Sequence, residues 1–267
     1  MRVWHLLVEP VPLRGSWNMA VDEILFKKAQ AERSTFLRFY HWERPTASVG
    51  YSQDVRRVAD VESCRRQGVD LVRRISGGKL VLHYHEVTYA VASADTEAFG
   101  ATLGESYGRI SRGLIRGLEL LGLAPRLAET SPEAYVKGTM PCFAFPARDE
   151  VEVGGKKIIG SAQKRTGAAF LQHGSIPLES DEALLRAVAR PAGGAEGAGM
   201  TSLAEAVGRP VSFEEAADYL ARGLAGFFAV RLEPFVLSPG DREAAAALEG
   251  LRYANDEWTF RRPGART

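Results

Sequence analysis

Residues 151–165 read VEVGGKKIIGSAQKR, and this segment carries the strongest local indication of the fold. Two β-prone runs flank the pair Gly154–Gly155, a combination typical of a tight β-hairpin. Another strand-like run, AAFLQHGSIPL, follows at residues 168–178. The segment therefore predicts a hairpin followed by a further strand. The small residues GSAQ at 160–163 are expected to form a turn between them.

Strand-like runs dominate the chain before this segment as well. They are rich in β-branched and aromatic residues, and proline and glycine separate them. The runs lie at residues 35–40, 46–51, 70–74 and 87–92. So many short strands within the first two-thirds of a chain predict one or more β-sheets.

Helical patterns lie at both ends of these strands. Residues 18–30 and 103–121 have apolar side chains at helical spacing, and Asp22 and Glu23 are expected near the start of the first helix, where negative charge is favourable. Ser212 is expected to cap a late helix as a capping box with Glu215, and the Gly/Ala-rich stretch at 189–199 is expected to be a flexible loop.

This order of elements predicts an α+β fold with mixed β-sheets, flanking helices and a helical C-terminal part. At 267 residues, the chain is long enough for one large domain. We expect a single domain over residues 1–267, with its core at about 30–230 and a helical extension at about 231–267.

Composition excludes several classes of function. The net charge is +1, from 34 basic and 33 acidic residues, which argues against a general electrostatic role on nucleic acid. No apolar run is long enough to cross a bilayer, so no membrane association is expected. Two cysteines cannot build a disulfide framework, and a reduced cytoplasmic compartment is expected.

Cys142 and Lys157, fifteen residues apart, suggest acyl transfer through a thioester. A free thiol has a pKa of about 8.5, and a neighbouring ammonium group favours the thiolate that attacks an acyl carbon. The alternative is a buried cysteine that acts as a small hydrophobic residue. Composition alone favours that alternative, so the decision depends on the surrounding motifs.

The segment RRISGG at residues 73–78 follows a predicted strand and has the form of a ligand-binding loop. Its glycines allow a tight turn, and successive N–H groups can hold an anion. It is not a Walker A motif, because Leu80 stands where Ser or Thr is required and Arg73 where the first glycine is required. A tight turn with two arginines in solvent is an equal alternative.

Three histidines raise the question of a metal site. His83 and His85 would share one face of a strand, and His173 lies on a later strand. No cysteine or carboxylate was identified at ligand spacing, so we expect hydrogen-bonding histidines and no metal.

Taken in order along the chain, eight motifs resemble the octanoyltransferases of the biotin/lipoate A/B protein ligase family, of the LipM type. They are WNMAVDEIL, RFYHWERPTASVGYSQ, RRISGG, LHYHEVTYAV, PCFAFPA, GKKIIGSAQKR, LQHGSI and RYANDEWTFRR. The resemblance covers nearly the whole chain. It implies a biotin/lipoate protein ligase-like catalytic domain whose mixed sheet surrounds an acyl-binding tunnel.

By position, the resemblance implies that Cys142 is the acyl-thioester nucleophile and that Lys157 lowers its pKa and helps to position the substrate carbonyl. The residues expected to line the tunnel and the acceptor entrance are Arg74, Ser76, Gly77, Gly78, His83, Gly160, Ser161, Ala162, His173 and Gly174.

The resemblance also implies the partners. The donor would be octanoyl-acyl carrier protein, and the acceptor a lysine of the glycine-cleavage H protein or of an E2 lipoyl domain. No cofactor is expected. Lys79 replaces the third glycine usual in the ATP-using ligases of the family, and Tyr84 replaces the Asp that commonly follows the histidine.

Three alternatives stay open at this point. An amidotransferase would take octanoyl or lipoyl groups from the H protein instead of the carrier protein. An ATP-dependent lipoate–protein ligase would not need Cys142. A non-catalytic acyl-binding protein would keep the fold without the chemistry.

Overall fold

The structure is a computed structural model that describes residues 1–128, 150–190 and 200–261. Cys142 and positions 191–199 of the Gly/Ala-rich stretch lie outside the described residues. The expectations for them therefore stay predictions.

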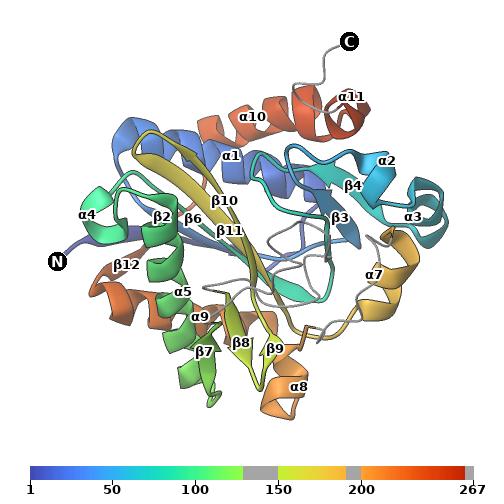
Figure 1. The fold of residues 1–267 in the computed structure, drawn as a ribbon. Coiled ribbons are helices and arrows are strands. Elements are labelled where there is room, and N and C mark those ends of the chain that lie inside the picture. The colour runs from blue at the N-terminus through green and yellow to red at the C-terminus, as the bar shows by residue number, and fades with distance from the viewer. Residues whose placement is uncertain (129–149, 191–199, 262–267) are drawn as a thin grey trace.

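Three β-sheets form the framework of the described chain (Figure 1). The largest has six strands in the order β10-β11-β6-β2-β1-β12, and two three-stranded sheets have the orders β4-β3-β5 and β7-β8-β9. The strands are β1 (Val3–Val8), β2 (Phe36–Tyr40), β3 (Thr46–Val49), β4 (Asp70–Arg73), β5 (Val81–His83), β6 (Glu86–Ser93), β7 (Pro125–Leu127), β8 (Val151–Val153), β9 (Lys156–Lys157), β10 (Gly160–Thr166), β11 (Ala169–Pro177) and β12 (Arg231–Pro234).

Parallel and antiparallel pairings occur together in the six-stranded sheet. β1 runs parallel to both β2 and β12, whereas β2, β6, β11 and β10 pair antiparallel in succession. The helices are α1 (Gly15–Glu32), α2 (Val55–Val58), α3 (Val61–Gln67), α4 (Thr96–Phe99), α5 (Leu103–Leu120), α7 (Glu182–Val188), α8 (Leu203–Val207), α9 (Phe213–Phe228), α10 (Pro239–Leu248), the π-helical turn η1 (Glu249–Tyr253) and α11 (Asp256–Phe260). The mixed sheets with flanking helices confirm the predicted α+β class.

Helices cover both faces of the six-stranded sheet (Figure 1). Side chains alternate along β2, so that Leu37 and Phe39 pack with α5 and α9, whereas Phe36 and Tyr40 pack with α1. A smaller apolar cluster lies where the sheet β4-β3-β5 meets α2, α3 and α7. The sheet between two helical layers is therefore buried on both faces and provides a rigid support for side chains at its edge.

Helix α1 corrects one expectation from the sequence. It begins at Gly15, so Asp22 and Glu23 lie in its middle, and its first turn has no acidic residue. Both carboxylates are buried, and they bind side chains elsewhere in the fold instead of the positive end of the helix. Glu23 accepts hydrogen bonds from Arg252 Nη1 at 2.6 Å and from the Tyr253 hydroxyl at 2.5 Å, which ties α1 to the C-terminal segment.

The cap of helix α9 differs from the capping box that the sequence predicts. The Ser212 hydroxyl accepts from the Glu215 amide as expected, but the Glu215 carboxylate binds Arg209 instead of closing the box. A complete capping box occurs at α5, between Thr102 and Glu105. The sequence analysis did not identify that box, although its spacing is visible.

The hairpin at residues 151–157 is confirmed, with Gly154 and Gly155 both at positive φ between β8 and β9. The expected GSAQ turn is wrong, because residues 160–163 lie in strand β10, which pairs antiparallel with β11 along its whole length.

The C-terminal part contains α10, η1 and α11, but residues 231–234 form strand β12, which pairs with β1 at the edge of the sheet. The sheet therefore includes strands outside residues 30–230. In the described part of the chain, no helix is both long and apolar enough to cross a membrane.

Candidate active site

A cavity lies between the six-stranded sheet and the sheet β4-β3-β5, and both sheets contribute to its wall. Of the residues predicted for the site, those in its wall are Arg74, Gly78, His83, Lys157, Gly160, Ser161, Ala162, His173 and Gly174. Within the described ranges, Ser76 and Gly77 are not among the lining residues; Ser76 is fully buried behind the wall and Gly77 is exposed. The fold thus brings together segments that are more than 100 residues apart in the sequence.

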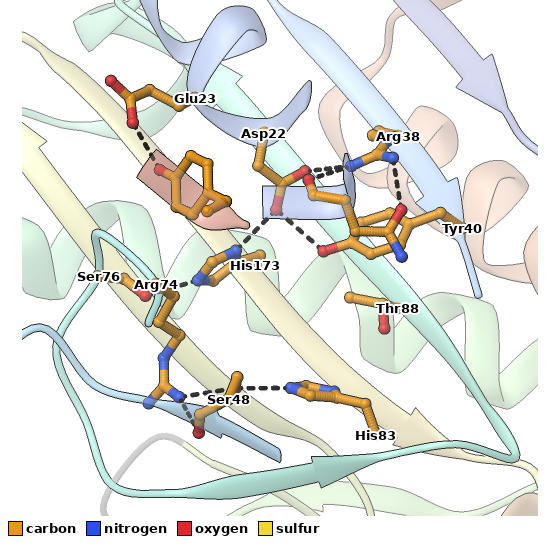
Figure 2. Close-up of polar contacts among 12 residues, drawn as sticks. Asp22, Glu23, Arg38, Tyr40, Ser48, Arg74, Ser76, His83, Thr88 and His173 are labelled. Atoms are coloured by element: carbon orange, nitrogen blue, oxygen red, sulfur yellow. Dashed lines mark hydrogen bonds and ion pairs between the residues drawn. The ribbon is translucent and has the colours of Figure 1, made fainter. Parts of the chain in front are cut away.

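The first polar network of the site centres on Asp22 (Figure 2). Its Oδ1 accepts from Arg38 Nη1 at 2.7 Å, and its Oδ2 accepts from the Tyr40 hydroxyl at 2.9 Å and from His173 Nδ1 at 2.8 Å. His173 Nε2 lies 2.6 Å from the Ser76 hydroxyl. We call these five residues the aspartate network. It connects helix α1 and strands β2 and β11 to the RRISGG loop.

Electrostatics fix the protonation state of this network. Burial alone would raise the pKa of Asp22, but the charge of Arg38 and the hydrogen bond and charge of His173 outweigh it, so the pKa lies below the usual value. Burial and the adjacent Asp22 raise the pKa of Tyr40 well above its usual value. The ionised Asp22 only accepts, so Nδ1 of His173 carries the proton that it donates to Asp22.

The second network centres on Glu86. Glu86 Oε1 accepts from His83 Nδ1 at 2.8 Å, and His83 Nε2 lies 2.8 Å from the Ser48 hydroxyl. Ser48 Oγ also accepts from Arg74 Nη1 at 2.9 Å. We call these four residues the glutamate network; Figure 2 shows its Arg74–Ser48–His83 part.

Further contacts hold Glu86 and His83 in place. Trp42 Nε1 donates to Glu86 Oε1 at 3.0 Å, and the Thr88 and Ser175 hydroxyls donate short hydrogen bonds to the same carboxylate. The Trp42 ring stacks on His83 with 4.2 Å between ring centroids and 13° between planes. Burial would raise the pKa of Glu86, but the charge of His83 and these hydrogen bonds lower it, so Glu86 is a carboxylate at neutral pH.

The two arginines of RRISGG are buried, which overturns the alternative of a solvated turn. Arg73 donates to the backbone carbonyls of Gly50 and Tyr51 at 3.0 and 2.8 Å, and to that of Thr259 in α11 at 2.7 Å. Arg74 donates to the carbonyls of Gly77 and Lys79 within its own loop. Both guanidinium groups therefore hold the loop in shape, and Arg73 also links it to the C-terminal segment.

Lys157 lies at the wall of the cavity and is almost fully buried, at 2% exposure. Its Nζ forms an ion pair of 2.7 Å with Glu150 Oε1, and Glu150 lines the same cavity. The site thus contains a desolvated cation in a fixed position.

Ser161 and Gly174 face each other where β10 pairs with β11. The Ser161 hydroxyl lies 2.7 Å from the Tyr89 hydroxyl, and burial raises the pKa of Tyr89 to about 12. A Cβ atom on Gly174 would lie 2.5 Å from the Tyr89 ring, so a larger residue has no room there. The absence of a side chain at Gly174 therefore allows the Tyr89 ring and the Ser161 hydroxyl to pack against strand β11.

The three histidines lie in separate hydrogen-bonded settings. His83 and His173 hydrogen-bond through both ring nitrogens, and His85 pairs with Asp181 near the surface. Across residues 1–128, 150–190 and 200–261, no group of three or more His, Cys, Asp or Glu side chains has the arrangement of a metal site.

Sequence reasoning missed the carboxylates and Ser48. Glu86 stands three residues after His83, a spacing that could have been noticed, and Asp22 is a charged residue within an apolar helical stripe. Ser48 had no local signal, because only the pairing of β3 with β5 brings it beside His83.

Comparison with known proteins places the chain in a family. Residues 14–225 match the lipoyl protein ligase A/B catalytic domain. The chain belongs to this family. It is 38% identical over 278 residues to a protein of Kyrpidia tusciae named octanoyltransferase LipM, covering 98% of this chain and 100% of that protein. It is 36% identical to the octanoyltransferase LipM of Symbiobacterium thermophilum, covering 93% of this chain and 95% of that protein.

Solved structures of this family share the fold. Lipoate-protein ligase A bound with ATP superposes with a TM-score of 0.83 at 22% identity, covering 97% of this chain and 99% of that chain. A bi-partite lipoate protein ligase of Thermoplasma acidophilum has a TM-score of 0.80 at 21% identity, covering 97% of both chains. The resemblance stated from the sequence is confirmed, and so is the ligase-like fold.

Proposed function

We propose that this protein is an octanoyltransferase of protein lipoylation. It would move an octanoyl group from octanoyl-acyl carrier protein, through a thioester on Cys142, to a lysine of the glycine-cleavage H protein or of an E2 lipoyl domain. The observation that carries the proposal is the buried ammonium group of Lys157 at the wall of the cavity. The near full-length similarity to proteins named octanoyltransferase LipM supports the acyl group.

The proposed reaction has two steps. In the first, the Cys142 thiolate attacks the thioester carbonyl of the donor, and the thiolate of the carrier's prosthetic group leaves. In the second, the neutral amine of the acceptor lysine attacks the acyl-enzyme, an amide forms and the Cys142 thiolate leaves. A thioester is a more reactive acyl donor than an amide, so the transfer proceeds without ATP.

Lys157 acts on the first step in this account. A fixed ammonium group favours the thiolate over the thiol and stabilises negative charge that develops on the substrate carbonyl oxygen. Glu150 positions that ammonium group, since Glu150 Oε1 holds Nζ at 2.7 Å. Arg74, His83, His173 and the small residues of β10 and β11 would form the walls that receive the acyl chain and the acceptor.

Burial provides most of the recognition of the acyl chain. At about 0.8 kcal/mol per methylene, seven saturated carbons contribute about 5 kcal/mol. One methylene more or less changes the affinity by about tenfold or less, so selectivity for eight carbons depends on the depth of the cavity.

The test compares donors in the absence of ATP. The enzyme is mixed with an acceptor lipoyl domain and with either octanoyl-acyl carrier protein or octanoylated H protein, beside a Cys142→Ala variant. The proposal predicts octanoylated domain from the carrier protein and none with the variant. Product only from the H protein would indicate an amidotransferase, and product only from free octanoate with ATP would indicate a ligase. A cytoplasmic location belongs to the proposal and follows from the expected partners.

A further inference from the structure

We infer that Ser48, His83 and Glu86 form a proton relay that accepts a proton from the acceptor lysine. The inference rests on the proposed function. It adds a base for the acceptor lysine, a role that the Cys142 thiol and Lys157 do not fill. Ser48 and His83 both line the cavity, and Glu86 lies behind them. The three come from β3, β5 and β6, so the relay exists only where the two sheets meet.

Hydrogen-bond directions follow from the ionised state of Glu86. A carboxylate only accepts, so His83 Nδ1 carries the proton that it donates to Glu86. His83 Nε2 lies 2.8 Å from the Ser48 hydroxyl, and the relay works in the tautomer in which Nε2 accepts from that hydroxyl. In that tautomer the Ser48 proton points toward a base.

Ser48 keeps one acceptor position for a substrate. A serine oxygen has two lone pairs, and Arg74 Nη1 occupies one of them at 2.9 Å. Among the residues that the structure describes, no donor occupies the second, so it can accept from an N–H group of a ligand in the cavity that Ser48 lines. The nearby guanidinium group also stabilises negative charge on the serine oxygen during proton transfer.

The aspartate network has the same order of groups but no such opening. Ser76, His173 and Asp22 are linked at 2.6 and 2.8 Å, like Ser48, His83 and Glu86. Within the described chain, however, Ser76 does not belong to the cavity wall. Only the relay that ends at Ser48 therefore presents its hydroxyl to a ligand.

The chemistry of the second step requires a base. A lysine side chain has a pKa of about 10.4, so at pH 7 only about one amine in 2,500 is neutral and able to attack. A positioned general base typically contributes a factor of 10² to 10⁴. Thioester aminolysis also requires one N–H proton to leave the nitrogen before the amide is complete.

The proton balance of the step is simple. The lysine ammonium group gives a proton to Ser48 Oγ while the Ser48 hydroxyl proton passes to His83 Nε2, which leaves a neutral amine on the acceptor. His83 becomes an imidazolium, and the Glu86 carboxylate stabilises its charge. The neutral amine then attacks, the bond from the nitrogen to the acyl carbon forms and the bond from that carbon to sulfur breaks. The Cys142 thiolate leaves, the second N–H proton goes to solvent, and His83 later returns its proton to solvent.

The test separates the two steps of the proposed reaction. Octanoyl-enzyme is prepared with octanoyl-acyl carrier protein, freed from the donor, and mixed rapidly with either a lipoyl domain or hydroxylamine, which is a neutral nucleophile at pH 7. The variants are Ser48→Ala and His83→Gln. Ser93→Ala is the matched control, because Ser93 is a buried strand serine bonded to Thr35 outside the cavity.

We expect all variants to form acyl-enzyme. Transfer to the lipoyl domain falls about 100-fold or more in Ser48→Ala and His83→Gln, whereas their reaction with hydroxylamine and both reactions of Ser93→Ala stay at the wild-type rate. Equal losses toward both nucleophiles, or no loss toward the domain, would overturn the relay while leaving the transferase intact. Absence of acyl-enzyme in the wild type would overturn the transferase and the relay together. If Ser48→Ala unfolds, His83→Gln gives the same decision.

Discussion

Replacing Asp22 with asparagine tests the aspartate network most sharply, because the substitution changes charge with little change in shape. In the wild type the carboxylate accepts from three donors, Arg38 Nη1, the Tyr40 hydroxyl and His173 Nδ1, at 2.7, 2.9 and 2.8 Å. The asparagine amide has one acceptor oxygen and an NH₂ group that faces donors. At least one buried hydrogen bond is therefore lost and one donor–donor contact is created.

The expected cost follows from burial. Asp22 is 1% and Arg38 0% exposed, and removing one partner of a buried ion pair costs about 3–5 kcal/mol. Arg38 keeps its contact with Glu9, which places the cost within this range and not above it. In a protein of this size the loss lowers the melting temperature by about 10 °C.

The assay is urea unfolding at pH 7, with Asp181→Asn as the control. Asp181 also pairs with a histidine, His85, at 2.9 Å, but the His85 side chain is 46% exposed. A solvent-exposed pair contributes about 1 kcal/mol or less. Equal effects of the two substitutions, or a loss below about 1 kcal/mol for Asp22→Asn, would refute the argument from burial.

The difference between wild type and Asp22→Asn also depends on pH in a defined direction. The pKa of Asp22 is lowered in the folded state, so its stabilisation is complete above the unfolded value of about 3.9. It is lost as the pH falls below that value, toward the folded pKa. The difference in unfolding free energy should therefore be constant from pH 5 to 8 and shrink below about pH 4.

Three further predictions concern the loop and the lysine. The Gly50→Ala variant should unfold at a lower urea concentration than Gly77→Ala. A Cβ on Gly50 would lie 2.0 Å from the Gly78 carbonyl oxygen, whereas a Cβ on Gly77 would face open space. Equal stability of the two variants would contradict the close approach of Gly50 to the RRISGG loop. Arg73→Met should cost about 3 kcal/mol or more by leaving buried carbonyls unpaired, and a loss below 1 kcal/mol in the same assay would show that water replaces the guanidinium group. Lys157→Gln should raise the pKa of the Cys142 thiol toward about 8.5, so that the pH midpoint of its alkylation by iodoacetamide moves upward; an unchanged midpoint would remove Lys157 from the proposed thiol activation.

Local sequence signals predicted the framework well. The Gly154–Gly155 turn, the strand at 36–40 and the long helix α5 follow from turn chemistry and hydrophobic periodicity, which act over a few residues. The GSAQ segment was predicted incorrectly as a turn, because small residues favour turns in isolation. Pairing with the long strand β11 outweighs that preference.

The site was only partly predictable, because its geometry depends on long-range pairing. His83, His173, Arg74 and Lys157 stood out through family motifs, and all four line the cavity. Asp22 did not, since its partner His173 lies 151 residues away and only the packing of α1 on the sheet brings the two together.

Buried charge is the common feature of what was missed. A carboxylate in the sequence is expected at the surface, and its burial becomes favourable only when donors converge on it. Asp22 and Glu86 each collect three or more donors, which come from strands β2, β5, β6 and β11 and from Trp42. No local pattern contains that information.

Intact-protein mass spectrometry after mixing the enzyme with octanoyl-acyl carrier protein, without ATP, tests the central claim most directly. Cys64→Ala provides the control for Cys142→Ala, because Cys64 is buried and burial raises the pKa of its thiol. The account predicts one octanoyl adduct, labile to hydroxylamine, on the wild type and on Cys64→Ala, and none on Cys142→Ala. An adduct that persists in Cys142→Ala, or no adduct on any form, would contradict it.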